Sequence, residues 1–139
     1  LVKQLGGRDT TAVGFAMGME RLISLLDQET LDKHYKYPHA VLLMMGERAQ
    51  NAGFALAEKL RDSLVELRIL TVFGGGSFKS QMKRADKSQA EIAIIIGDNE
   101  LDNNIVTIKY LRADKNNDKP QQEQVSQETL MNLLAEITQ

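Results

Sequence analysis

The sequence predicts an α/β domain over residues 40–139, built on a mixed five-stranded sheet with three helices. Two observations predict it. Between residues 40 and 96, short apolar runs alternate with segments in which apolar residues recur at helical spacing. The apolar runs also stop at glycines, namely Gly46, Gly74 and Gly97. A strand–helix–strand–helix–strand order of this kind is typical of parallel strands joined by right-handed crossovers.

The first half of this domain gives the clearest signals. Residues 40–45 form a continuous apolar run that predicts a buried strand, and residues 48–64 carry a helical stripe of apolar positions. Residues 67–73 predict a second strand. After three glycines, Ser77 can cap a helix that runs to about Ser88. Residues 91–96 predict a third buried strand.

The second half is more polar. Residues 98–104 are interpreted as a polar turn and residues 105–111 as a partly exposed strand, because apolar and polar residues alternate there. Residues 112–122 predict a loop, followed by a short strand near residues 123–125. A final helix, capped by Ser126, has one apolar face, which consists of Leu130, Leu133, Leu134 and Ile137.

The segment before this domain is predicted to be a strand at residues 11–13, a glycine turn and a helix over residues 19–26. We assign residues 1–30 to this segment, residues 31–39 to a polar linker and residues 40–139 to the main domain. The apolar face of the short helix consists of Leu22, Ile23, Leu25 and Leu26.

The composition excludes several classes of site. Cysteine is absent, so there is no disulfide framework or thiolate metal centre, and His34 and His39 are the only imidazoles. We therefore expect no metal site. No apolar run approaches the ~18–20 residues of a membrane span, and no signal peptide is apparent, so we expect a cytoplasmic protein without membrane contact. The net charge of −2 argues against a protein that coats nucleic acid over its whole surface.

A candidate binding loop lies between the second strand and the helix that follows it. Residues 74–77 read Gly-Gly-Gly-Ser, and glycines at the carboxyl end of a strand let the backbone approach an anion at a helix N-terminus. The lysine and Ser/Thr of a phosphate-binding P-loop are missing. A flexible turn without a ligand explains this segment equally well.

The helix after this loop has a basic face. Lys79, Lys83 and Lys87 recur every four residues, with Arg84 beside them, whereas Phe78, Met82 and Ala85 are expected to face the core. Beside a glycine loop, such a stripe indicates phosphate-backbone contacts with a nucleic acid, and a merely solvated helix face is the alternative. Phe73, Phe78 and Tyr110 are the aromatic residues available for base stacking. Ser77 has no histidine nearby, so this domain is expected to bind rather than to catalyse.

Residues 14–21, "GFAMGMER", followed by "LISLL", resemble the third signature motif of class II aminoacyl-tRNA synthetases. The matching residues are Gly14, Gly18, Glu20 and Arg21, and Ala16 stands where many members have glycine. The preceding "LVKQLGGRDTTAV" is similar to the histidyl-tRNA synthetases. The later segment "FGGGSFKSQMKRADK" is similar to the class IIa anticodon-binding domain that ends those enzymes, so the resemblance covers essentially the whole chain.

The resemblance implies the C-terminal part of a histidine–tRNA ligase, a homodimeric enzyme that activates histidine with ATP and Mg²⁺ and transfers it to tRNA(His). Arg21 would hold the γ-phosphate of ATP, and a guanidinium suits such a bidentate contact. Gly14 and Gly18 would leave room for adenine and histidine, and Glu20 would orient Arg21 or cap the helix. The family's other motifs lie upstream of Leu1, so we expect no aminoacylation by this chain alone. Residues 1–30 are then expected to be disordered, packed on the main domain or held in a non-native oligomer.

The same resemblance implies that the main domain binds the anticodon stem-loop of tRNA(His). We expect the phosphate and sugar contacts at Gly75, Gly76, Lys79, Lys83 and Lys87, with Phe73 and Arg84 directed toward the bases. A synthetase-like regulatory or dimerisation module without tRNA binding is one alternative, but the intact motif with Arg21 argues against it. A flavodoxin-like protein for a small ligand is another, but it leaves the motif at residues 14–21 unexplained.

Overall fold

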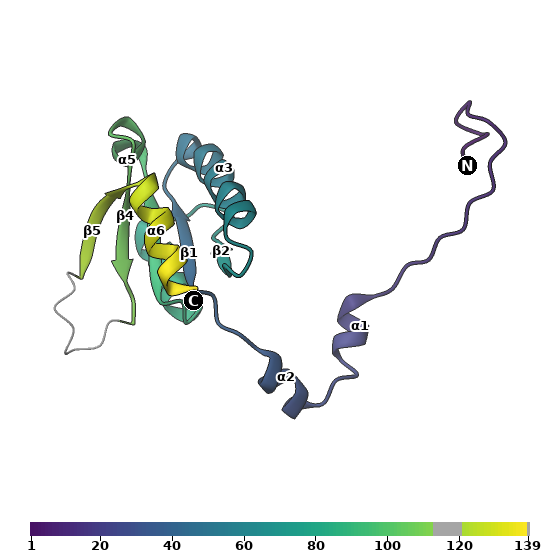
Figure 1. The fold of residues 1–139 in the computed structure, drawn as a ribbon, viewed down its shortest axis with the longest axis horizontal. Helices are drawn as coiled ribbons and strands as arrows, with labels where there is room; N and C mark the ends of the chain where they lie inside the picture. Colours follow the sequence, from purple (N-terminus) through teal and green to yellow (C-terminus); the bar gives the residue numbers. More distant parts are fainter. Residues whose placement is uncertain (113–120, 139) are drawn as a thin grey trace. The chain divides into compact units, whose positions relative to one another are not determined.

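The computed structural model describes residues 1–112 and 121–138, and the chain divides into two compact units, Leu1–Tyr35 and Lys36–Gln139 (Figure 1). The second unit contains a five-stranded mixed sheet with helices, as the sequence predicts. Among the described helices, none combines the length and apolar character that crossing a bilayer requires.

The first unit contains two short helices, α1 (Met19–Ile23) and α2 (Gln28–His34). The polar segment after α1 was expected to be a linker, but it forms α2 because Asp27 caps it: the carboxylate accepts a hydrogen bond from the Thr30 amide at 2.7 Å. This bond holds the pKa of Asp27 below its usual value. The helix predicted over residues 19–26 is wrong at its end, since α1 stops at Ile23.

The strand predicted at residues 11–13 is also wrong, because residues 7–18 have no regular secondary structure. A strand needs a neighbour for its backbone hydrogen bonds, and no described residue shares a backbone hydrogen bond with residues 11–13. The apolar face predicted for the short helix stays exposed to solvent: Leu22, Ile23, Leu25 and Leu26 have exposed fractions of 42%, 49%, 78% and 48%.

The sheet of the second unit has the order β2-β1-β3-β4-β5 (Figure 1). The three strands β1 (Ala40–Met44), β2 (Ile69–Thr71) and β3 (Ile92–Ile96) run parallel. The remaining two, β4 (Ile105–Tyr110) and β5 (Gln122–Ser126), continue the sheet antiparallel. Every residue of β1 and β3 is buried, which explains why their sequences are continuous apolar runs.

Two helices cover one face of the sheet and a third covers the other. Helices α3 (Glu47–Ser63) and α6 (Gln127–Ile137) pack on Leu42, Ile94 and Ile108 to form the larger core cluster. Helix α4 (Phe78–Lys87) packs its Ala85 against the opposite face, which includes Val41 and Leu43. The predicted caps of α4 and α6 are confirmed, since Ser77 accepts from the Ser80 amide and Ser126 from the Thr129 amide.

The polar turn predicted over residues 98–104 contains instead a fourth helix, α5 (Asp98–Asp102). Glu100 explains it, because its carboxylate accepts from the Gly97 amide at 3.0 Å and from the Thr107 hydroxyl of β4 at 2.9 Å. The predicted loop at residues 112–122 lies mostly outside the described residues. The short strand predicted near residues 123–125 is confirmed and is longer, as β5.

Candidate nucleic-acid interface

The glycine loop after β2 has a backbone that only glycine adopts readily. Gly74, Gly75 and Gly76 have φ angles of +84°, +65° and +104°, in the left-handed region that costs other residues ~1–2 kcal/mol each. No atom of the described residues lies within 4 Å of the position that a Gly74 Cβ would occupy, so this side of the loop is open to them.

The loop leads directly into the N-terminus of α4. The Ser77 hydroxyl accepts a hydrogen bond from the Ser80 amide at 3.3 Å. The Gln81 amide donates to the Ser77 carbonyl. Within the described part of the chain, no protein group accepts from the amides of Phe78 and Lys79. Unpaired amides of a first helical turn offer hydrogen bonds to an anion such as a phosphate.

Gln81 fixes the start of α4 on the sheet. Strand β2 ends at Thr71, two residues before its neighbour β1 ends at Met44, so the last backbone groups of β1 lack a strand partner on that side. The buried Gln81 carboxamide replaces the strand: Oε1 accepts from the Met44 amide at 3.1 Å, and Nε2 donates to the Met44 carbonyl at 3.0 Å. Nε2 also lies 3.4 Å from the Gly76 carbonyl, which ties the glycine loop to the same point.

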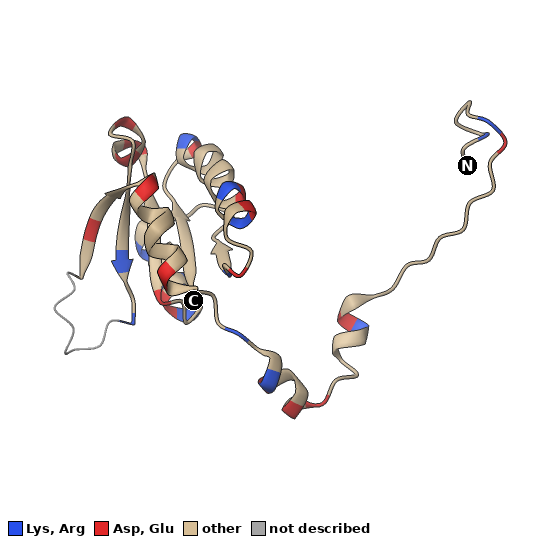
Figure 2. Cartoon of the chain, viewed as in Figure 1, with Lys and Arg blue, Asp and Glu red and all other residues tan. Residues whose placement is uncertain are grey.

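The predicted basic face of α4 is exposed, and its members are Lys79, Lys83, Arg84 and Lys87. The one acidic residue of the helix, Asp86, is paired with Arg112 at 3.0 Å. By contrast, α5 and α6 carry acidic residues and no basic ones (Figure 2). Positive charge is therefore concentrated on α4, where it favours an anionic partner.

Arg84 has a structural contact that the sequence did not indicate. Its guanidinium donates to the Phe73 carbonyl at 3.0 Å, so it holds the segment that precedes the glycine loop. This places the charge of Arg84 at the loop, although a side chain that bonds the backbone in this way is less free to reach a base than we predicted.

The aromatic residues differ most from expectation. Phe78 is 45% exposed rather than in the core, because Gln81 already lies at the end of the sheet and a residue one turn earlier lies beyond it. Tyr110 packs on the α6 face, where burial and its hydrogen bond to Glu123 raise its pKa to about 12. Phe73 is 56% exposed and its ring contacts that of Phe54 on α3, with centroids 5.1 Å apart.

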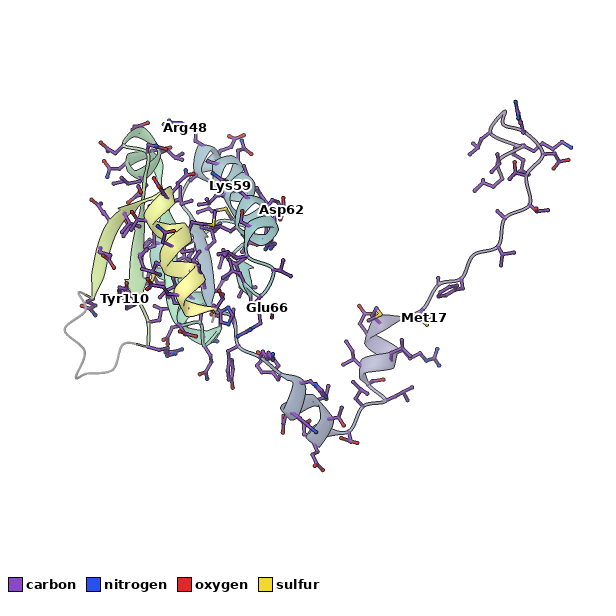
Figure 3. All side chains as sticks on the ribbon, viewed as in Figure 1. Met17, Arg48, Lys59, Asp62, Glu66 and Tyr110 are labelled. Carbon is purple, nitrogen blue, oxygen red and sulfur yellow. The ribbon has the colours of Figure 1, made fainter. Side chains whose placement is uncertain are left out.

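The residues assigned by resemblance to an ATP and amino-acid pocket lie in the first unit. Gly18 is the N-cap of α1, and both Glu20 and Arg21 are exposed. Gly14 lies before α1, and no described atom comes within 4 Å of its Cβ position. The neighbouring Met17 is also exposed (Figure 3). The described residues of this unit bring no second charged group to Arg21, so they do not by themselves enclose a nucleotide.

Among the described residues, no cluster of three His, Asp or Glu side chains is placed to hold a metal ion.

Comparison with known families decides what this domain is. Residues 39–137, most of the chain, match the family model described as the anticodon binding domain. The chain belongs to the anticodon-binding domain family. In this anticodon-binding domain, the matched region begins at His39, immediately before β1, and ends at the last residue of α6.

Solved structures agree with this assignment. The apo histidyl-tRNA synthetase of S. aureus is 26% identical, with a TM-score of 0.60 over 84% of this chain and 28% of that one. The histidyl-tRNA synthetase of Nostoc sp. PCC 7120 is 21% identical, with a TM-score of 0.61 over 86% and 28%. The RNA-binding domain of threonyl-tRNA synthetase from Cryptosporidium parvum Iowa II is 15% identical, with a TM-score of 0.61 over 72% and 23%. The chain spans about a quarter of the length of these proteins.

Proposed function

We propose that this chain is part of a histidine–tRNA ligase and that its anticodon-binding domain binds the anticodon stem-loop of tRNA(His). The observation that carries the proposal is the family match over residues 39–137, together with the exposed basic face of α4 beside an open glycine loop. Gly75 and Gly76 contribute backbone, and Lys79, Lys83, Arg84 and Lys87 contribute charge, to phosphate and sugar contacts.

Two observations support histidine, rather than another amino acid, as the substrate of the ligase. The two histidyl enzymes align over 84% and 86% of this chain, so the similarity extends beyond residues 39–137 into the N-terminal segment, whereas the threonyl domain aligns over 72%. Independently of these alignments, residues 14–21 resemble the third class II motif, and residues 1–13 resemble the segment that precedes it in histidyl-tRNA synthetases.

The N-terminal unit has a separate role in this proposal. In the intact, homodimeric ligase, Arg21 binds the γ-phosphate of ATP, and Gly14 and Gly18 leave space for adenine and histidine. Mg²⁺ accompanies the ATP there. Catalysis of this kind depends on many positioned groups, so this chain alone has no aminoacylation activity. Turnover of the purified chain in a histidine-dependent pyrophosphate-exchange assay would contradict this.

The test of the main proposal is binding of a tRNA(His) anticodon stem-loop across a salt series. The comparison is with the same stem carrying a threonine anticodon, which also separates the histidyl and threonyl assignments. We expect tighter binding to the histidine loop and a loss of affinity as salt rises. Equal affinity for both loops contradicts the specificity, and no binding at low salt favours the regulatory module.

Single substitutions then assign the contacts. Each phosphate contact to a single strand contributes about 0.7 to the slope of log K against log salt, so Lys79→Gln, Lys83→Gln and Lys87→Gln should each lower the slope by about that amount. Lys33→Gln is the matched control, because Lys33 is an exposed lysine on α2, in the first unit and outside the anticodon-binding domain. A slope that falls equally for Lys33→Gln would contradict specific phosphate contacts by α4.

A further inference from the structure

Four residues from two segments meet beside the glycine loop. Gln50 and Phe54 are four residues apart on α3, so they lie on the same side of the helix one turn apart. The ring of Phe54 contacts that of Phe73, with centroids 5.1 Å apart and planes inclined by 33°. Gln50 Nε2 lies 3.9 Å from the Cβ position of Gly75. Helix α3 lies beside β2, whose chain continues into Phe73 and the loop (Figure 1).

This cluster has aromatic surface that the fold does not cover. Phe54 is 42% exposed and Phe73 is 56% exposed, whereas Leu56 and Leu60, the neighbouring large apolar residues of α3, are buried. The pair therefore has ring surface available to a ligand. A ring stack of this kind is sequence-tolerant, because every nucleobase has a π-face.

The cluster also has an unused polar group at its edge. The half-buried side chain of Gln50 makes no hydrogen bond within the described part of the chain, and its carboxamide lies near the loop with its donors and its acceptor available. A glutamine amide can donate to and accept from the edge of a base at once.

A cation at one end of the aromatic pair indicates the kind of ligand that fits. The exposed Arg84 guanidinium donates to the Phe73 carbonyl at 3.0 Å. The Arg61 guanidinium of α3 donates to the Ile69 carbonyl and the Thr71 hydroxyl of β2, but it is paired with Glu58 and adds no net charge there. An exposed aromatic pair with an arginine beside it suits an aromatic ligand that carries phosphate, and an unpaired nucleotide has both properties.

We propose that Phe54 and Phe73 form a stacking site for one unpaired base of the anticodon loop, and that Gln50 hydrogen-bonds the edge of that base. The inference rests on the proposed function and adds to it a base-reading site on α3, on the opposite side of the glycine loop from the lysines of α4. Phosphate contacts by α4 position the loop, and this cluster supplies the contact that differs between bases.

The experiment uses the full chain and tRNA(His) anticodon stem-loops in which 2-aminopurine replaces one loop nucleotide at a time. Stacking on an aromatic ring changes 2-aminopurine fluorescence. We expect one loop position to respond on binding, and Phe54→Leu and Phe73→Leu to abolish that response and weaken binding by about 5- to 100-fold. Both variants should leave the salt slope unchanged. The matched control is Phe15→Leu, because Phe15 is an exposed phenylalanine of the first unit. It should change neither the fluorescence response nor the affinity.

Gln50→Ala tests the base contact separately. It should reduce the affinity ratio between the native loop and a loop with a substitution at the responsive position, by roughly 5- to 100-fold, while the fluorescence response remains. Urea unfolding of each variant checks that the domain stays folded, which is expected because the replaced rings are half exposed.

The outcomes separate this inference from the function it rests on. If the unsubstituted chain binds the stem-loop with salt dependence, but Phe54→Leu and Phe73→Leu bind as tightly as Phe15→Leu, the stacking site is refuted and the proposed function stands. If the fluorescence response survives both substitutions, the base stacks elsewhere and the inference is again refuted. If the unsubstituted chain binds no stem-loop at low salt, the proposed function fails, and this inference fails with it.

Discussion

Replacing Gln81 tests the claim that a side chain completes the sheet beneath the glycine loop. Gln81→Met keeps the length of the side chain and removes its polar groups, so the Met44 amide and carbonyl lose the partners they have at 3.1 and 3.0 Å. Gln81 is 1% exposed and Met44 is 2% exposed, so water cannot replace the carboxamide without opening the core.

The magnitude follows from those two backbone groups. Each buried polar group that loses its partner costs about 1–3 kcal/mol, so Gln81→Met should reduce the free energy of unfolding by about 2–6 kcal/mol. That is a large part of the ~5–15 kcal/mol typical of a domain. The lower limit alone corresponds to a fall in Tm of about 8 °C for a domain of about 100 residues.

The assay is urea unfolding of the full chain, with Gln124→Met as matched control, because Gln124 is an exposed glutamine on β5. The control should stay within about 0.5 kcal/mol of the unsubstituted chain. If Gln81→Met also stays within that range, Gln81 does not complete the sheet and the reasoning is refuted.

A second variant at the same position, Gln81→Glu, distinguishes lost hydrogen bonds from altered packing. An ionised carboxylate can accept from the Met44 amide but cannot donate to the Met44 carbonyl. Protonation restores a donor, so this variant should gain stability relative to Gln81→Met as the pH falls. A constant difference between the two variants from pH 7 to pH 4 would contradict this explanation.

Three further substitutions or conditions test other parts of the fold. Burial and the charge of Arg68 hold the pKa of His39 below its usual 6.5. As the pH falls, the unfolded chain therefore binds the proton before the folded chain does. The free energy of unfolding should then decrease below about pH 6.5, by at most ~1.4 kcal/mol per pH unit. Urea unfolding from pH 8 to pH 5 should show this decrease, and His39→Asn should reduce it. Gln89 has a φ of +62°, so Gln89→Gly should raise the free energy of unfolding by about 0.5–1 kcal/mol, measured in urea; a decrease would show that the turn is not strained. A Gly53→Ala methyl would lie 2.5 Å from the Met44 sulfur, so this variant should lose about 1–3 kcal/mol in thermal unfolding unless Met44 moves without cost.

The order of the elements in the second unit could be predicted because its local signals agree with its packing. Strands β1 and β3 are buried on both faces and therefore appear as unbroken apolar runs. Ser77 and Ser126 mark helix starts because their hydroxyls bond the amides three residues later.

The predictions that failed depend on groups distant in the sequence or on partners that the described residues do not supply. Helix α5 is stabilised by Glu100, whose second contact is Thr107 in the next strand. The predicted strand at residues 11–13 lacks a neighbouring strand among the described residues. In both cases a local pattern of polar or apolar residues does not contain the information that decides the structure.

The candidate site likewise combines features that the local sequence predicts with features that depend on distant residues. The charge of Lys79, Lys83 and Lys87 could be recognised from their spacing, because exposure of a polar helix face is a local property. The Phe54–Phe73 contact could not, since it joins α3 to the segment after β2 and becomes apparent only when the parallel register is known. The signal that the sequence offers is a phenylalanine, Phe54, at a position of α3 outside its buried stripe.

The charges at the carboxyl edge of the sheet argue against the small-ligand alternative. Ligands of open α/β sheets commonly bind where the strand order reverses, which in this domain is between β1 and β3. That position is spanned by Arg48, whose guanidinium lies 3.4 Å from Asp98 and 2.9 Å from Asp102, at the ends of α3 and α5 (Figure 3). The two carboxylates already neutralise the arginine, and α5 adds Glu100 beside them, so a phosphate would meet excess negative charge there. At the same edge lie the open Gly74, the cations of α4 and two amides of its first turn that have no acceptor among the described residues. Charge therefore directs an anionic partner to the β2 side of the sheet, which is where the aromatic pair also lies.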